Sequence, residues 1–162
     1  FLAAAKALKA EGQSVRFICC GAFEGDDIKD VVLRAHAEGV VSYLGLVDDM
    51  RVVLEETDCV VLPTYYNEGV PRILIEAIAM GRPVISTPLS GCLDVVVDGV
   101  DGFVIPPMNP QTLANAMGKI ASIEKSALDS FSRAGMDMAR TRFNEQVIIQ
   151  EYLAKIASMA TR

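Results

Sequence analysis

Short apolar segments alternate with longer amphipathic segments along most of this chain. Continuous apolar runs of strand length predict strands that are buried on both faces. The amphipathic segments between them, opened by proline or ended by glycine, predict helices. This alternation predicts an α/β fold, a parallel sheet with helices on both faces. The predicted strands are 14–20, 40–44, 58–63, 83–87 and 103–105; the helices are 1–10, 27–38, one opened by 46–50, 71–81 and a short one at 92–97.

The C-terminal part of the chain carries only helical patterns. Asn109 is a suitable N-cap for a helix that has Pro110 at its first position. A second helix is predicted over 124–139, and a last helix is predicted over about 144–160. No linker or repeat separates these segments, so the sequence predicts one domain over residues 1–162. The apolar stripe of the last helix consists of Ile149, Tyr152, Leu153, Ile156 and Met159.

Residues 64–85 form a loop, a helix and a strand, and they contain an unusual carboxylate. The helix from Pro71 to Gly81 is apolar nearly all round, which is typical of a buried helix. Glu76 lies within it, and a buried carboxylate is costly without a partner. Either Glu76 caps a backbone group or pairs with a core arginine, or it binds a ligand. A second carboxylate, Glu68, lies in the loop that joins strand to helix, where open parallel sheets bind ligands and helix ends favour anions.

Other residues of this loop have both a functional and an ordinary explanation. Gly69 either needs a positive φ or a close ligand, or it is a common loop glycine. Arg72 lies in the first helical turn, where a bound phosphate would explain a cation, but a solvated arginine is the alternative. Tyr65 and Tyr66 either stack on a sugar or base or pack under the loop. Because Glu68 is on a loop, its spacing from Glu76 does not define a glycosidase-type pair.

Composition and charge exclude several classes of protein. The 162 residues are 51% hydrophobic, which predicts a compact globular domain. A net charge of −6 without any basic run argues against nucleic acid as a partner. The apolar runs are too short to span a membrane. No nucleophile–histidine constellation, phosphate loop or GxGxxG pattern is present.

The sequence predicts no metal site and a reducing, cytoplasmic location. A single histidine, His36, makes a zinc site of the Cys/His type improbable. The acidic pairs at 26–27 and 48–49 are explained as first-turn partners of helix dipoles. The cysteines lack metal-ligand spacing, and most lie in apolar strand segments. They are Cys19, Cys20, Cys59 and Cys92.

The segment NEGVPRILIEAIAMGRPVI resembles the signature of retaining glycosyltransferases of the GT-B fold, family 4. That signature is a glutamate, seven residues and a second glutamate, followed by alanine, a glycine turn and Pro-Val-Ile. The flanking segments VSYLGLVDDM, TDCVVLPTYY and STPLSGCLDVVVDGVDGFVIPP also resemble this family. The resemblance covers nearly the whole chain. It implies a Rossmann-like domain, the C-terminal half of a GT-B enzyme, which binds the nucleotide-sugar donor.

The resemblance also implies a role for each matching residue. Glu76 would bind the ribose hydroxyls of a nucleoside diphosphate sugar, and Glu68 would lie against the donor sugar as the catalytic carboxylate. Main-chain groups near Gly45 would hold the base. No metal is expected, because protein cations and the helix end would stabilise the leaving diphosphate. The donor-binding residues implied are Gly45, Leu46, Val47, Gly69, Val70, Arg72 and Glu76.

The chain departs from the family pattern in two ways. Many relatives have a glycine where this chain has Pro71, which donates no N–H. The basic residues that the family places earlier would precede Phe1, as would a first strand and the N-terminal acceptor domain. We therefore expect this part alone to bind donor weakly and to be inactive as an enzyme.

The version of the motif present here, Val-Pro-Arg, resembles the branch that builds bacterial capsule, O-antigen or exopolysaccharide on lipid-linked saccharide acceptors. Such an enzyme would be cytoplasmic or peripheral at the inner face of the membrane. Two alternatives stay open. One is a sugar-nucleotide epimerase of the GT-B fold, for which additional acid/base residues are not found. The other is a non-catalytic doubly wound domain that binds proteins.

Overall fold

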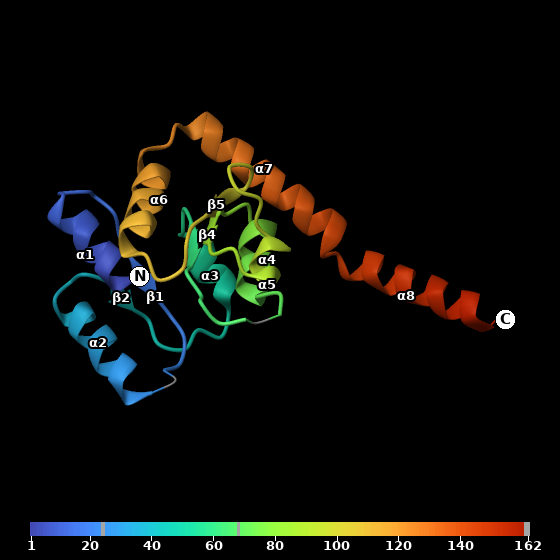
Figure 1. The fold of residues 1–162 in the computed structure, drawn as a ribbon, viewed down its shortest axis with the longest axis horizontal. Helices are drawn as coiled ribbons and strands as arrows, with labels where there is room; N and C mark the ends of the chain where they lie inside the picture. The colour runs from blue at the N-terminus through green and yellow to red at the C-terminus, as the bar shows by residue number, and fades with distance from the viewer. Residues whose placement is uncertain (24, 68, 161–162) are drawn as a thin grey trace.

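The fold is an α/β arrangement of short parallel strands and longer helices (Figure 1). The structure, a computed structural model, describes residues 1–23, 25–67 and 69–160. The predicted α/β fold is confirmed. The strands are β1 (Ile18–Cys19), β2 (Ser42–Tyr43), β3 (Val60–Leu62), β4 (Val84–Ser86) and β5 (Gly102–Val104). The helices are α1 (Leu2–Ala10), α2 (Asp26–Ala37), α3 (Met50–Glu55), α4 (Arg72–Ala79), α5 (Ser90–Leu93), α6 (Pro110–Ser122), α7 (Lys125–Arg142) and α8 (Glu145–Ala160).

The described strands form two parallel sheets. One sheet pairs β1 with β2, and the other has the order β3-β4-β5, with Ile85 opposite Val61 on one side and Phe103 on the other. The strands are shorter than predicted. An apolar run in the sequence indicates which residues are buried, but it does not indicate which of them pair with a neighbouring strand. Phe17, for example, is buried next to β1, although it lies outside the paired residues of that strand.

Helices cover both faces of the three-stranded sheet. Neighbouring residues of a strand point to opposite faces, and on β4 these are Val84 and Ile85. Val84 belongs to a buried cluster that includes Leu54 of α3 and Ala77 of α4, whereas Ile85 belongs to a cluster that includes Leu8 of α1. The sheet therefore lies between two apolar layers, as the sequence predicted.

The predicted starts of two C-terminal helices are confirmed by capping hydrogen bonds. The Asn109 side chain accepts a hydrogen bond from the backbone N–H of Thr112 at 3.1 Å, and Pro110 is the first residue of α6. The Asn144 side chain accepts one from the N–H of Gln146 at 2.9 Å, immediately before α8. Both helices thus begin where an asparagine satisfies an N–H that the helix leaves unpaired.

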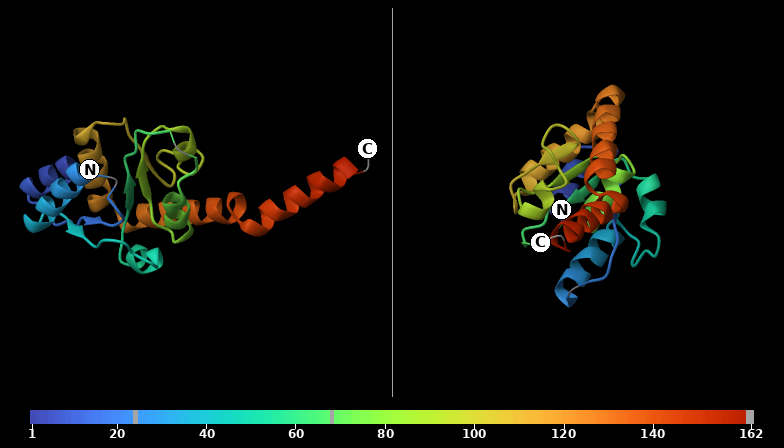
Figure 2. Two further views of the ribbon diagram at one scale, coloured as in Figure 1. Left: turned by 90° about the horizontal axis from the view of Figure 1, so that it is seen from below. Right: turned by 90° about the vertical axis from the view of Figure 1, so that its right-hand side faces the viewer.

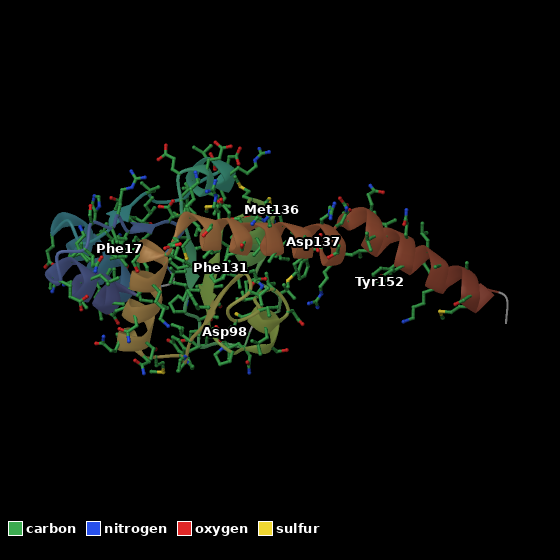
Figure 3. The ribbon with its side chains drawn as sticks, turned by 90° about the horizontal axis from the view of Figure 1, so that it is seen from above. Phe17, Asp98, Phe131, Met136, Asp137 and Tyr152 are labelled. Carbon is green, nitrogen blue, oxygen red and sulfur yellow. The ribbon has the colours of Figure 1, made fainter. Side chains whose placement is uncertain are left out.

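Helix α8 extends away from the rest of the chain (Figure 2). Its predicted apolar stripe is exposed, and Tyr152 projects from it at a distance from the body of the domain (Figure 3). Among the helices of the described residues, none combines the length and the hydropathy that a membrane crossing needs. The exposed stripe residues are Ile149, Tyr152, Leu153, Ile156 and Met159.

Gly102 lies where β5 passes closest to β4. It is paired with Val84 in the parallel register, and a Cβ atom at residue 102 would collide with the Val84 carbonyl oxygen. The backbone N–H of Val84 also donates a hydrogen bond to the carbonyl of the preceding residue, Asp101, at 3.3 Å. Glycine is therefore required here by the close approach of two backbones.

We predict that Gly102→Ala lowers the free energy of unfolding by roughly 1–3 kcal/mol, because β4 and β5 must separate to admit the methyl group. Urea unfolding would measure the change. Gly118→Ala is the matched control. Its added Cβ would lie 3.5 Å from a Leu8 methyl carbon, an ordinary contact, and alanine favours a helix interior by ~0.5–1 kcal/mol. Stabilisation by both substitutions would contradict the prediction.

Asp101 is a buried carboxylate in the turn before β5. It is 1% exposed, and its Oδ1 accepts a hydrogen bond from the N–H of Val97 at 2.8 Å. Its Oδ2 is buried with no hydrogen-bond partner among the described residues. Burial raises the pKa of Asp101, since the charged form loses its hydration.

We predict that Asp101 makes the domain less stable as pH rises. Because its pKa is higher in the folded chain than the unfolded value of ~3.9, folding takes up a proton between the two values. The free energy of unfolding of the wild type, relative to Asp101→Asn, should therefore fall as pH rises through that window. Urea unfolding of both chains at a series of pH values would measure this. Parallel pH profiles would contradict it.

Candidate functional site

Helix α4 begins directly after the loop that leaves β3. Its N-cap residue is Pro71, and no described side chain caps the helix. One face of α4 is buried against the sheet and α7, with Leu74, Ala77 and Ile78 fully inaccessible. Across this interface, Gly135 of α7 lies so near that a Cβ atom there would be 3.2 Å from the Ile78 Cβ. The helix is therefore held firmly while its other face remains open.

Glu76 lies at the edge of the exposed face of α4. The prediction that it is buried among apolar residues is wrong, because its side chain is 37% exposed. The apolar residues of α4 are concentrated on the face toward the sheet, and Ala79 is exposed. The sequence pattern suggested an all-apolar helix because alanine and isoleucine also occur on the partly exposed side.

Glu76 forms an ion pair with Arg72, one helical turn earlier. Arg72 Nη2 lies 2.9 Å from Glu76 Oε1, and the Arg72 side chain is 89% exposed. The alternative that Glu76 pairs with an arginine is therefore correct, but the expectation that this arginine lies in the core is wrong, because Arg72 is on the surface. An exposed pair at this spacing contributes only about 0.3–0.5 kcal/mol, so both side chains can turn to other partners at small cost.

The loop residues before α4 are accessible. Gly69 does not adopt a positive φ, and no atom lies within 4 Å of a Cβ built on it. The positive-φ explanation for this glycine is therefore wrong, and the space beside it stays open. Val70 is 39% exposed. Glu68, the predicted catalytic carboxylate, lies outside the described residues, so its role stays a prediction.

The predicted base-binding segment follows β2. Gly45 adopts a φ of 74°, and its carbonyl accepts a hydrogen bond from the N–H of Gly21 at 2.8 Å. This bond fastens the chain after β2 to the chain after β1. Leu46 is 78% exposed and Val47 is half-buried. The Gly45 carbonyl thus has one partner within the chain and keeps a second lone pair.

The structure joins some of the predicted residues and not others. Arg72 and Glu76 are in direct contact. Among the hydrogen bonds and ion pairs of residues 1–23, 25–67 and 69–160, none joins the segment 45–47 to either of them. Two surface hollows lie elsewhere, one beside residues 9–16 and one between residues 98–106 and α6. Arg72 and Leu46 are both largely exposed, at 89% of the Arg72 side chain and 78% of Leu46.

Two hydroxyl residues at the end of β4 contribute to the site but were not identified from sequence. Ser86 Oγ donates to the Leu62 carbonyl at 2.9 Å, and Thr87 Oγ1 donates to the Thr64 carbonyl at 2.7 Å. Both side chains are fully buried. They fix the end of β3 and the first residue of the loop. A Ser-Thr pair ending an apolar strand was the only available signal.

The two tyrosines that follow Thr64 are on the surface. Tyr65 is 54% exposed and Tyr66 is 66% exposed, so the alternative that they pack under the loop is wrong. No cluster of three or more His, Cys, Asp or Glu side chains suited to a metal ion occurs in the described part of the chain.

Comparison with known proteins gives several glycosyltransferases among the relatives. A curated relative, the putative colanic acid biosynthesis glycosyltransferase WcaL of Salmonella typhimurium, is 28% identical over 153 residues, which is 90% of this chain and 38% of the relative. The N,N'-diacetylbacillosaminyl-diphospho-undecaprenol alpha-1,3-N-acetylgalactosaminyltransferase of Campylobacter jejuni is 30% identical over 115 residues, 71% of this chain and 30% of the relative. This chain therefore spans between 30% and 38% of the length of these two relatives.

A solved structure and a family model also match this chain. The crystal structure of Anabaena Alr3699/HepE in complex with UDP and glucose superimposes with a TM-score of 0.79 at 24% identity, covering 93% of this chain and 43% of that one. At this identity the similarity concerns the fold. The model of the family described as Glycosyl transferases group 1 matches residues 1–122. This chain belongs to the group 1 glycosyltransferase family.

Proposed function

We propose that this chain binds the nucleoside diphosphate sugar donor of a retaining glycosyltransferase. The observation that carries the proposal is the exposed Arg72–Glu76 pair at the start of α4, beside the loop that leaves β3. A cation and a carboxylate one helical turn apart match the two polar parts of such a donor, its diphosphate and its ribose. The complex of HepE with UDP and glucose supports this choice of ligand.

Arg72 would bind the diphosphate. Its guanidinium offers several N–H donors in a planar arrangement that suits phosphate oxygens, and the N-terminal end of α4 adds N–H groups and a positive dipole end. Negative charge grows on the diphosphate as the sugar leaves. Groups already placed for that charge would stabilise the transition state without a metal ion.

Glu76 would accept hydrogen bonds from the ribose hydroxyls. Its contact with Arg72 in the free chain is exposed and weak, so the ligand would replace the ion pair with two charge-assisted contacts. The main chain of residues 45–47 would contact the base, and Gly69 and Val70 would approach the sugar. Glu68 would lie against the reacting part of the donor sugar as the catalytic carboxylate.

The acceptor would be bound by a further domain of the full enzyme. The named Campylobacter jejuni relative acts on a saccharide linked to diphospho-undecaprenol, and the Salmonella typhimurium relative belongs to colanic acid biosynthesis. We therefore propose a lipid-linked saccharide as acceptor and a place in bacterial polysaccharide synthesis. Such an acceptor would bring the enzyme to the inner face of the cytoplasmic membrane. This chain alone would be inactive, because the acceptor would be bound by the further domain.

We predict that the chain binds one of UDP, GDP and ADP, and that Glu76→Ala and Arg72→Ala weaken this binding for different reasons. Loss of a charge-assisted contact should cost about 1–3 kcal/mol, or roughly 5- to 150-fold in Kd. Glu76→Ala should weaken both the nucleotide and its nucleoside, because both contain ribose. Arg72→Ala should weaken only the nucleotide. Isothermal titration calorimetry at low ionic strength would measure these affinities.

Asp137→Ala is the matched control for this experiment. Asp137 forms an exposed ion pair with Arg140 on α7, so the substitution removes a similar carboxylate outside the site (Figure 3). It should leave nucleotide affinity unchanged. If wild type and Glu76→Ala bind nucleotide with equal affinity, Glu76 does not bind the ribose. If the wild type binds none of the nucleotides, the proposed function is contradicted.

A further inference from the structure

Tyr65 and Tyr66 form a stacked aromatic pair on the surface after β3. Their ring centroids are 4.2 Å apart with an interplanar angle of 34°, and their hydroxyl oxygens are 2.9 Å apart. Adjacent residues of an extended strand point to opposite sides, so the chain must turn for these rings to meet. The hydroxyl contact and the stacking together hold the two rings as one unit.

The turn that brings the rings together is fixed from within the fold. The Thr64 hydroxyl accepts a hydrogen bond from the Tyr66 N–H at 3.3 Å, which is the local bond of a threonine turn. The Thr64 carbonyl is held by Thr87 Oγ1, and Thr87 is fully buried at the end of β4. The aromatic pair is thus attached to the sheet through Thr64.

The aromatic pair lies outside the hydrophobic core of the described residues. Neither ring belongs to the two core clusters of the described residues, and more than half of each residue's surface is accessible. Tyrosine combines an apolar ring with a polar hydroxyl, and it is enriched at binding interfaces for this reason. A loop at the end of a strand, on a rigid support, is also where binding residues concentrate.

We propose that the Tyr65–Tyr66 pair is a platform for a sugar ring. This inference rests on the proposed function and adds a contact for its glycosyl substrate. The C–H face of a pyranose packs on the negative face of an aromatic ring, and the tyrosine hydroxyls can exchange hydrogen bonds with sugar hydroxyls. The pair lies in the same loop as Gly69 and Val70, which are proposed to approach the donor sugar, whereas the base is assigned to residues 45–47 after β2.

The sugar ring that the platform binds can come from two sources. One source is the glycosyl unit of the donor, and the other is the saccharide of the acceptor. Both present the same C–H faces and hydroxyl groups, so the chemistry of recognition is shared. The two sources differ in whether the sugar is attached to a nucleotide, and this difference separates them by experiment.

The test replaces both rings by Tyr65→Ala with Tyr66→Ala and measures nucleotide and sugar binding separately. Calorimetry would compare UDP with UDP-glucose, and saturation-transfer NMR would follow methyl glycosides of glucose, galactose, mannose and N-acetylglucosamine. Removal of the platform should weaken sugar binding by roughly three- to tenfold and leave UDP within about twofold. Tyr65→Phe with Tyr66→Phe should retain most of the binding, because the rings remain.

Each arm of the test has a distinct reading. Weaker UDP-glucose with unchanged UDP assigns the donor sugar, and weaker methyl glycoside with unchanged UDP-glucose assigns the acceptor sugar. Three outcomes would overturn the platform. The first is that the double-alanine chain binds every sugar probe as the wild type does, and the second is that it loses affinity for UDP and UDP-glucose equally. The third is that the wild type shows no saturation transfer to any glycoside and binds UDP and UDP-glucose with equal affinity. The glycoside measurement does not depend on nucleotide, so failure of the wild type to bind any of UDP, GDP and ADP would overturn the proposed function separately.

Tyr152→Ala is the matched control, because Tyr152 is 68% exposed on α8, outside the proposed site. It should change none of these affinities. The thermal midpoint of every variant should stay near that of the wild type, since the exchanged rings are exposed. A folded double-alanine chain then links any lost affinity to the rings themselves.

Discussion

The hydrogen bonds from Ser86 to the last carbonyl of β3 and from Thr87 to a carbonyl of the loop after it connect the core to the candidate site. These two hydroxyls are fully buried and find their acceptors in Leu62 and Thr64, where β3 ends. A buried hydroxyl without a partner would cost about 1–3 kcal/mol. The bonds therefore stabilise β4 and, at the same time, determine where the chain leaves the sheet. The loop with its tyrosines, and α4 after it, start from a fixed point.

The site itself is built from weak interactions on a strong support. The buried face of α4 carries the packing, through Leu74 and Ile78 against the sheet and α7. Its open face carries Arg72 and Glu76, whose exposed ion pair contributes little to folding. Such a division keeps charged groups available to a ligand, because stability does not depend on their mutual contact. Substitutions at the two charges should therefore act on binding and not on the fold.

Periodicity and local chemistry predicted the α/β class, the helix order and the Asn109 cap. They did not predict strand length, because Phe17 is apolar and buried without belonging to the paired part of β1. Glu76 was placed correctly in the helix but assigned the wrong burial, since the orientation of α4 on the sheet is a tertiary property. The contact of Thr87 with Thr64 depends on segments that meet only in the folded chain, and the stacking of Tyr65 on Tyr66 depends on the turn that starts at Thr64. No sequence pattern reports such contacts directly.

Gly135 shows how a distant segment can control the orientation of the site. Its missing side chain lets α7 approach Ile78 of α4, and any Cβ there would come within 3.2 Å of the Ile78 Cβ. A larger residue at 135 would act as a wedge between the two helices and tilt α4 on the sheet. Arg72 and Glu76 would then move together as a rigid body relative to the loop after β3. The packing of α7 against α4 therefore determines how the proposed donor-binding charges are oriented, although α7 carries neither of these charges.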